Sequence, residues 1–130
     1  MELEPQLSRA SQLPSPLRVL VVDDNLDAGQ LLGMLVERGG HQTRVVGSAR
    51  EAIAVAQELQ PDVALIDIGL PDMNGYDLTR ALRSQLQRCR FIAVTGHSSQ
   101  SAIARSISAG FETHLTKPVN AEDLLKLIEK

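Results

Sequence analysis

Short apolar runs alternate with stretches of helical spacing along most of this chain, and that alternation limits the fold more than any other feature of the sequence. The runs are rich in Val and Ile and occupy residues 17–22, 43–46, 63–66, 91–94 and, most weakly, 113–116. Alternating strands and helices favour a parallel sheet in which right-handed crossovers place helices on both faces. Runs that are apolar at nearly every position suit strands buried on both faces. We therefore predict an α/β fold built from strand–helix units.

Caps and helix breakers mark the limits of the helices between these runs. The first helix is predicted to end at Gly39–Gly40, and a Ser48–Glu51 capping box to begin the second. Ser98 or Ser99 and then Asn120 are the predicted caps of the fourth and fifth helices. Five such units indicate a flavodoxin-like (βα)5 three-layer sandwich with strand order 2-1-3-4-5. Residues spaced three and four apart predict the buried faces, formed by Ala28, Leu31, Leu32 and Leu35 in the first helix and by Ala102, Ile103 and Ile107 in the fourth.

The composition suits one domain with an aliphatic core. The chain has 130 residues, of which 43% are hydrophobic but only 2% aromatic, and this length is ordinary for a single domain. Half of the six prolines lie in residues 1–16. We therefore predict a flexible lead-in or linker at 1–16 and the folded domain at 17–130.

Charge and cysteine content narrow the class of protein. The net charge is −3, and without a basic excess we expect no direct binding to nucleic acid or to an anionic membrane surface. The single cysteine cannot form an internal disulfide, which suits a reducing cytoplasm. The segment MELEPQLSRA lacks the pattern of a signal peptide, so we expect none, and no apolar run approaches the ~18 residues that span a bilayer. These features predict a cytoplasmic protein.

Polar side chains follow four of the predicted strands at the points where the strands end. Asp23 and Asp24 follow the first strand, Asp67 the third, Thr95 the fourth and Lys117 the fifth. The carboxyl ends of parallel strands lie at one edge of the sheet, where ligands bind in such folds. We therefore expect three carboxylates, one hydroxyl and one amine to converge there.

A divalent cation would offset the negative charge of this cluster. Three carboxylates at one place are costly unless a cation neutralises them. The candidate ligands are hard oxygens, which favours Mg²⁺, with Mn²⁺ as an alternative, over zinc. Lys117 and Thr95 would then bind oxygens of a phosphate. A carboxylate beside a metal ion and a lysine is also a suitable nucleophile for phosphoryl transfer.

Four segments, each at a predicted strand end, together resemble the receiver domains of two-component response regulators, the group that includes chemotaxis regulators. They are VLVVDDN, ALIDIGLPDMNGYDL, AVTGH and HLTKPVN. The likeness extends from Leu17 to Lys130. It implies that Asp67 is the phospho-acceptor and that Asp24 binds Mg²⁺ directly, with Asp23 acting mainly through water. Asp67 and the backbone carbonyl of Gly69 would complete the protein ligands.

The resemblance also implies how the signal would leave the site. Thr95 would move to hydrogen-bond the phosphoryl group, and Lys117 would pair with one of its oxygens. The peptide bond between Lys117 and Pro118 is cis in many relatives. The space that Thr95 leaves would let His114 shift at the switch position, where relatives usually have Tyr or Phe. The surface of the fourth helix, fifth strand and fifth helix would then change.

A phosphorelay protein, and not a conventional enzyme, is what the resemblance implies. The chain would accept a phosphoryl group from a phosphohistidine on a histidine kinase or a histidine phosphotransfer domain, and would catalyse only its own phosphorylation and dephosphorylation. In relatives, the positions of Gly69 and His97 control the access of water, and the glycine leaves one side open. With His114 at the switch position, HLTKPVN is more similar to receivers attached to hybrid histidine kinases, so further domains of a longer chain are possible partners.

Other classes of protein match the sequence less well. A phosphatase of the haloacid dehalogenase type needs a second Asp two residues after its nucleophile, where this chain has Gly69. A P-loop NTPase needs G-x-x-x-x-G-K-[ST] and a dinucleotide enzyme needs G-x-G-x-x-G after the first strand, and the chain has neither. The Asp pair also fits a helix cap. A pseudo-receiver that acts only as a docking module stays as the alternative function.

Overall fold

The structure, a computed structural model, describes residues 16–96 and 100–130, the side chains of 100–103 excepted. Strands and helices alternate through these residues, as the sequence predicts. The strands are β1 (Arg18–Val22), β2 (Gln42–Val46), β3 (Val63–Asp67), β4 (Arg90–Thr95) and β5 (Thr113–Thr116). The helices are α2 (Leu26–Arg38), α3 (Ala49–Leu59), α4 (Gly75–Arg83), α5 (Gln100–Ala109) and α6 (Ala121–Ile128).

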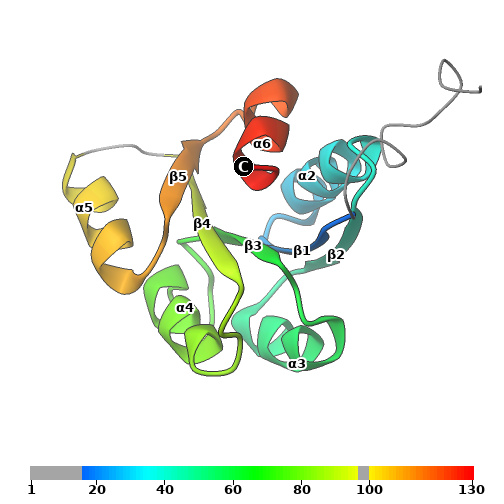
Figure 1. The fold of residues 1–130 in the computed structure, drawn as a ribbon. Coiled ribbons are helices and arrows are strands. Elements are labelled where there is room, and N and C mark those ends of the chain that lie inside the picture. Colours follow the sequence, from blue (N-terminus) through cyan, green and yellow to red (C-terminus); the bar gives the residue numbers. More distant parts are fainter. Residues whose placement is uncertain (1–15, 97–99) are drawn as a thin grey trace, which may run out of the picture.

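The sheet has five parallel strands in the order β2-β1-β3-β4-β5. Helices α2 and α6 cover one face, while α3 and α4 cover the other, with α5 beside the edge strand β5 (Figure 1). This arrangement is the predicted flavodoxin-like three-layer sandwich. No helix in the described part of the chain is long and apolar enough to cross a membrane.

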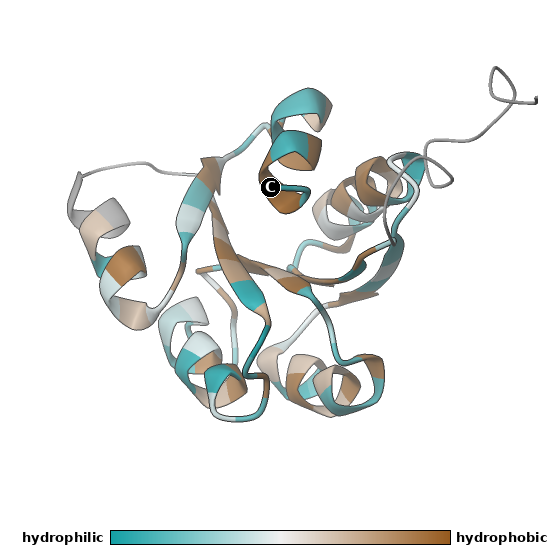
Figure 2. Cartoon of the chain, viewed as in Figure 1, coloured by the Kyte–Doolittle hydropathy of each residue, from teal (hydrophilic) through white to brown (hydrophobic). Residues whose placement is uncertain are grey.

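The core is divided by the sheet into two aliphatic clusters, because alternate strand residues point to opposite faces. In β3, Leu65 packs under α2 and α6, and Ile66 packs on the side of α3 and α4. Both are fully buried. The strands in the centre of the molecule are accordingly the most hydrophobic part of the ribbon (Figure 2). Burial on both faces explains why these runs are apolar throughout.

The predicted buried face of α2 is partly wrong. Leu32 is buried, but Leu31 is 57% exposed, and the helix instead turns Gly29, Gly33 and Val36 toward the sheet. A Cβ atom at Gly29 would lie 3.0 Å from Val45 Cγ1, and one at Gly33 would lie 2.9 Å from Val45 Cγ2. The two glycines therefore let the helix approach β2 closely, and apolar spacing alone did not indicate a glycine face.

The predicted buried face of α5 is also partly wrong. Ile107 is 59% exposed, whereas Ser106 and Ala109 are buried. Because α5 lies at the edge of the sheet, its small side chains are enough to cover the sheet there. The predicted caps Ser98 and Ser99, His97, the side chains of Ala102 and Ile103, and nearly all of the 1–16 lead-in lie outside the residues and side chains that the structure describes.

The other predicted helix limits are confirmed. The Ser48 side chain accepts a hydrogen bond from Glu51 N, and the Asn120 side chain accepts from Glu122 N and Asp123 N. Gly39 is the C-cap of α2. Helix α3 ends at Leu59, followed by a left-handed residue and then a proline. The sequence therefore specifies where most of these helices begin and end.

Two side chains hold the end of α6 at the amino edge of the sheet. His41 Nδ1 accepts a hydrogen bond from Leu17 N (3.0 Å), and its Nε2 lies 2.8 Å from Glu129 Oε2. Arg90 donates to the carbonyl oxygens of Leu127 and Ile128, each at 2.8 Å. The sequence offered no partner for His41, because its contacts come from the two ends of the domain. These contacts lie at the amino ends of the strands, whereas the predicted site lies at their carboxyl ends.

Candidate functional site at the carboxyl edge of the sheet

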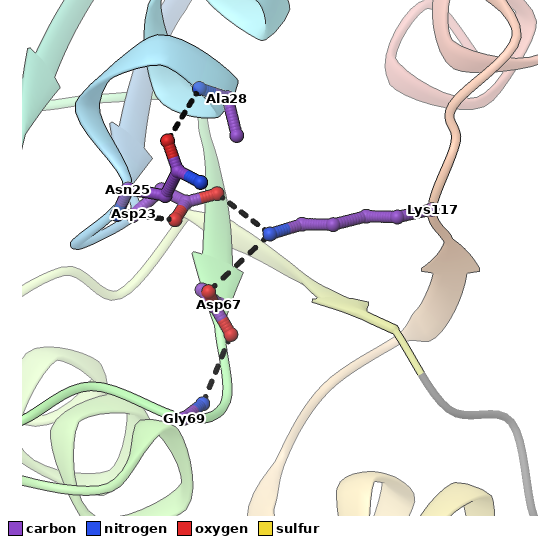
Figure 3. Close-up of polar contacts among 6 residues, drawn as sticks. All are labelled: Asp23, Asn25, Ala28, Asp67, Gly69 and Lys117. Atoms are coloured by element: carbon purple, nitrogen blue, oxygen red, sulfur yellow. Dashed lines mark hydrogen bonds and ion pairs between the residues drawn. The ribbon is translucent and has the colours of Figure 1, made fainter.

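Three carboxylates converge at the carboxyl edge of the sheet, as predicted. Asp23 and Asp24 follow β1, and Asp67 is the last residue of β3. One carboxylate oxygen from each lies within 4.8 Å of the others. Lys117, directly after β5, extends its side chain toward Asp23 and Asp67 (Figure 3). Four of the predicted site residues are thus brought together.

Asp23 is held in place by the turn that starts α2. Its Oδ1 atom accepts a hydrogen bond from Asn25 N (3.0 Å), and the Asn25 side chain accepts from Ala28 N (3.1 Å) and caps the helix (Figure 3). The residue that caps α2 is therefore Asn25, and neither aspartate of the preceding pair is its N-cap. Asp23 is only 1% exposed, and such a buried carboxylate needs a compensating charge.

Lys117 supplies that charge. Its Nζ atom lies 2.9 Å from Asp23 Oδ2 and 3.4 Å from Asp67 Oδ2. Burial disfavours the charged form of Lys117, but the hydrogen bond to Asp23 and the attraction of both carboxylates outweigh burial, so its pKa is raised. The lysine is therefore a stable cation between the two carboxylates. The peptide bond from Lys117 to Pro118 is cis.

Asp67 presents a partly desolvated carboxylate. Burial is the largest influence and raises its pKa, and the neighbouring Asp23 adds to the rise. The hydrogen bond from Gly69 N to Asp67 Oδ1 (2.9 Å) and the charge of Lys117 oppose this change without cancelling it. A Cβ atom at Gly69 would have only Asp67 Oδ1 nearby, at 3.8 Å. The side of the carboxylate next to Gly69 is therefore open.

The loop between β3 and α4 is fixed at two points. Asp72 accepts hydrogen bonds from Ala49 N (3.0 Å) and Arg50 N (3.1 Å) at the start of α3, and these bonds lower its pKa. A Cβ atom at Gly75 would lie 2.8 Å from Ile68 Cα. An acidic residue in a loop is common, so the sequence gives no advance signal of the contacts that Asp72 makes.

Thr95 and His114 lie at the same edge, on neighbouring strands. Thr95 ends β4, and its carbonyl oxygen accepts a hydrogen bond from Lys117 N (2.8 Å). His114 in β5 is half-buried and pairs in register with Ala93. Residues two apart on a strand, and residues paired across strands, point to the same face. Thr95 and His114 therefore share the face that α3 and α4 cover.

The donor set fits a hard divalent cation. Three carboxylates face one ammonium, which leaves an excess of negative charge that Mg²⁺ or Mn²⁺ would offset. Asp23, Asp24 and Asp67 could hold the ion, and Asp24 is the most exposed of them. The carboxyl edge therefore brings together a candidate cation site, a partly desolvated carboxylate and a lysine.

This site and fold match a known family. The family model for the response regulator receiver domain matches residues 19–129. The chain is a member of the response regulator receiver family, in agreement with the resemblance noted in the sequence.

Individual relatives agree with this family. The chain is 34% identical to the transcriptional regulatory protein PhoP of Escherichia coli over 84% of this chain and 49% of PhoP. A receiver domain from Methanospirillum hungatei has 32% identity, a TM-score of 0.81, and coverage of 88% of this chain and 92% of that one. The chain spans about half the length of the curated relatives that it matches first.

A further structure shows the fold alone. The receiver domain of Ssk1 from Saccharomyces cerevisiae, crystallised with the histidine phosphotransfer protein Ypd1, has 23% identity and a TM-score of 0.79. The similarity covers 87% of this chain and 86% of the other.

Proposed function

We propose that the chain accepts a phosphoryl group on Asp67 from a phosphohistidine of a partner protein. The observation that carries this proposal is the position of the Asp67 carboxylate, beside Lys117 and two further carboxylates at the open carboxyl edge of the sheet. Carboxylates form acyl phosphates in other phosphoryl transfers. Family membership adds weight, since receiver domains act in two-component signalling.

The proposed transfer is a single displacement. An oxygen of Asp67 attacks the phosphorus, the O–P bond forms, and the N–P bond of the donor breaks. The imidazole leaves with the electron pair and takes a proton from solvent. Lys117 stays charged and binds a phosphoryl oxygen, and Gly69 N holds Asp67 Oδ1 in place. Loss of the phosphoryl group to water then resets the domain, so the chain catalyses only reactions on itself.

Asp23, Asp24, Asp67 and the backbone carbonyl of Gly69 are the proposed ligands of Mg²⁺ or Mn²⁺. The ion would supply positive charge that offsets the negative charge of the phosphoryl oxygens during the transfer. The buried Asp23 already has Lys117 as its partner, which suits contact through a water molecule. The exposed Asp24 is free to turn toward the ion directly.

Thr95 and His114 are the proposed switch. Thr95 would move toward the phosphoryl oxygens, and His114 on the same face of the sheet would follow into the space. The surface formed by α5, β5 and α6 would then favour one of two states that both exist beforehand. An imidazole is smaller than the Tyr or Phe ring that relatives usually have at this position.

The partner is proposed to dock on α2. Leu26, Leu31 and Met34 are each more than half exposed on this helix. A mainly apolar groove of about 220 Å³ adjoins this surface and continues to Lys117. It is lined by Leu31 itself and by Leu35, Pro118 and Val119. A protein that carries its phosphohistidine on a helix could cover this surface while it reaches Asp67. A histidine kinase or phosphotransfer domain is that partner, and Ssk1 offers a precedent for the latter.

The setting of the domain is also a proposal. Residues 1–16 would form a linker to the receiver at 17–130 in the cytoplasm, and the receiver could belong to a hybrid histidine kinase. Neither nucleic acid nor a membrane is a proposed partner of the domain itself. Activity of any longer protein would reside in segments beyond this domain.

Intact mass tests the acceptor chemistry. The protein is incubated with acetyl phosphate and Mg²⁺, with and without a chelator, beside Asp67→Asn and the control Asp72→Asn. A gain of one phosphoryl group, about 80 Da, is expected only with Mg²⁺ and only where Asp67 is intact. Full labelling of Asp67→Asn would overturn the site. No gain by the unmodified protein, together with no binding of beryllofluoride, would favour the docking-only pseudo-receiver.

A further inference from the structure

Tyr76 lies where the loop after Asp67 meets α5. Its ring is 7% exposed and belongs to the first turn of α4. The guanidinium carbon of Arg105, in α5, lies 4.5 Å from the centroid of this ring. Phe111, which follows α5, meets the ring edge to face, with centroids 6.3 Å apart and planes at 77°. One ring therefore contacts both α5 and the segment that leaves it.

This cluster differs from the rest of the core. The chain has one tyrosine, two phenylalanines and no tryptophan, so two of its three aromatic rings meet here. Edge-to-face and cation–π contacts depend on the relative orientation of their partners. Within the described part of the chain, Arg105 forms no ion pair, and the ring face is its recorded partner. The contact is thus a directional link in a largely aliphatic core.

The link continues to the acceptor through backbone atoms. A Cβ atom at Gly75 would lie 2.8 Å from Ile68 Cα and 3.0 Å from the carbonyl oxygen of Asp67. Gly75 N also donates to the Ile68 carbonyl at 2.8 Å. Because α4 rests directly on the backbone beside Asp67, a small shift of that backbone moves the first turn of α4 and the Tyr76 ring with it.

We infer that the cluster of Tyr76, Arg105 and Phe111 couples the state of Asp67 to the position of α5. This inference rests on the proposed function of Asp67 as the acceptor. Tyr76 and Arg105 are positioning residues, since neither is recorded in contact with the carboxylate cluster. The route runs through α4 and is separate from the proposed route through Thr95 and His114. In this route the ring of Tyr76 takes the part that relatives usually give to the Tyr or Phe at the position of His114.

The single tyrosine makes the inference testable without added probes. The protein is prepared with ¹³C-labelled tyrosine rings and ¹⁵N-labelled amides, so that Tyr76 gives one set of ring signals. Beryllofluoride and Mg²⁺ serve as the phosphoryl mimic, and native mass counts the bound mimic. The variants are Arg105→Gln, which removes the charge, Arg105→Lys, which keeps it, and the control Arg80→Gln, an exposed α4 residue paired with Asp77.

We expect the mimic to shift the Tyr76 ring signals and the amide signals of 104–109 together. In Arg105→Gln the mass gain and the Gly69 amide shift should persist, while the shifts at 104–109 fall to less than half. Arg105→Lys should retain more of them, and Arg80→Gln should match the unmodified protein. A merely structural role for Arg105 would change stability and leave these shifts intact.

Two results would overturn the inference alone. The first is that the mimic binds but the Tyr76 ring signals do not shift. The second is that the amide shifts at 104–109 in Arg105→Gln equal those of the unmodified protein. Absence of the mass gain in the unmodified protein would instead overturn the proposed function, and the inference with it.

Discussion

Lys117 Nζ lies 2.9 Å from Oδ2 of Asp23, so its nearest partner is a buried carboxylate of the candidate cation site and not the proposed acceptor. Asp23 is 1% exposed, whereas the Lys117 side chain is 30% exposed. The lysine therefore contributes to the folded state before any phosphoryl group arrives. Its structural and chemical roles can be separated by substitution.

Lys117→Met should destabilise the protein, because it leaves Asp23 buried without its cation. Removing one partner of a fully buried pair costs about 3–5 kcal/mol, and because Lys117 is partly exposed we expect a smaller loss of about 2–3 kcal/mol. The double variant Lys117→Met/Asp23→Asn should recover at least half of this loss. Urea unfolding at pH 7 measures both. A single variant as stable as the unmodified protein would contradict the pairing.

Mg²⁺ should stabilise the fold by binding the native carboxylate cluster. At ten times its dissociation constant, a ligand that binds only the native state raises the free energy of unfolding by about 1.4 kcal/mol. Asp24→Ala should lose this gain with little change in metal-free stability, because Asp24 is exposed. Asp27→Ala, a nearby acidic residue outside the cluster, is the control. Equal stabilisation of both variants by Mg²⁺ would rule out Asp24 as a ligand.

Gly75→Ala should destabilise the loop that follows Asp67. The added Cβ would lie 2.8 Å from a backbone atom, which cannot move aside as a side chain can, and overpacking of this kind costs about 1–3 kcal/mol. Gly69→Ala is the matched control, since its nearest contact is at 3.8 Å, and we expect a change within about 0.5 kcal/mol. Thermal unfolding compares them. Equal effects at the two positions would show that the close approach at Gly75 does not matter.

The ion pair of Arg90 and Glu112 should make stability depend on pH in the acid range. Two hydrogen bonds of 2.8 and 2.6 Å join the side chains, and the bond from Arg90 lowers the pKa of Glu112. Because the folded-state pKa is the lower one, the stabilisation is complete above the ordinary value of ~4.3 and is lost as the pH falls through the lowered value.

Glu112→Gln isolates this contribution. The pair is partly exposed, so the free energy of unfolding of the unmodified protein should exceed that of the variant by about 0.5–1 kcal/mol at pH 7. That difference should shrink toward zero below pH ~4. Denaturant unfolding from pH 3 to 7 measures it. A difference that stays constant over this range would mean that the ion pair is not its source.

The fold was largely predictable because apolar runs and caps act locally. Strand order and helix limits follow from alternation, from Ser48 and Asn120, and from the Gly39–Gly40 pair. The faces of α2 and α5 were harder to predict. A periodic leucine pattern suggests burial, but α2 packs through Gly29 and Gly33, whose lack of a side chain gives no hydrophobic signal.

The candidate site was predictable in its members and less so in its contacts. Parallel strands bring Asp23, Asp24, Asp67 and Lys117 to one edge, so their meeting follows from topology. The preference of Lys117 for Asp23, and the hydrogen bonds that Asp72 accepts from the start of α3, depend on side-chain positions far apart in sequence. His41 is a similar case, with partners 24 and 88 residues away along the chain. No local pattern carries such information.

The glycine face of α2 inverts the usual tolerance of a helix to substitution. Its smallest residues, Gly29 and Gly33, leave no room for growth, whereas its larger Leu31 and Met34 lie more than half exposed. A scan of every substitution, scored only for folding, should therefore tolerate changes at Leu31 and Met34 and penalise changes at Gly29 and Gly33. If polar substitutions at positions 31 and 34 nevertheless abolish function in cells, the constraint comes from another protein that binds this helix.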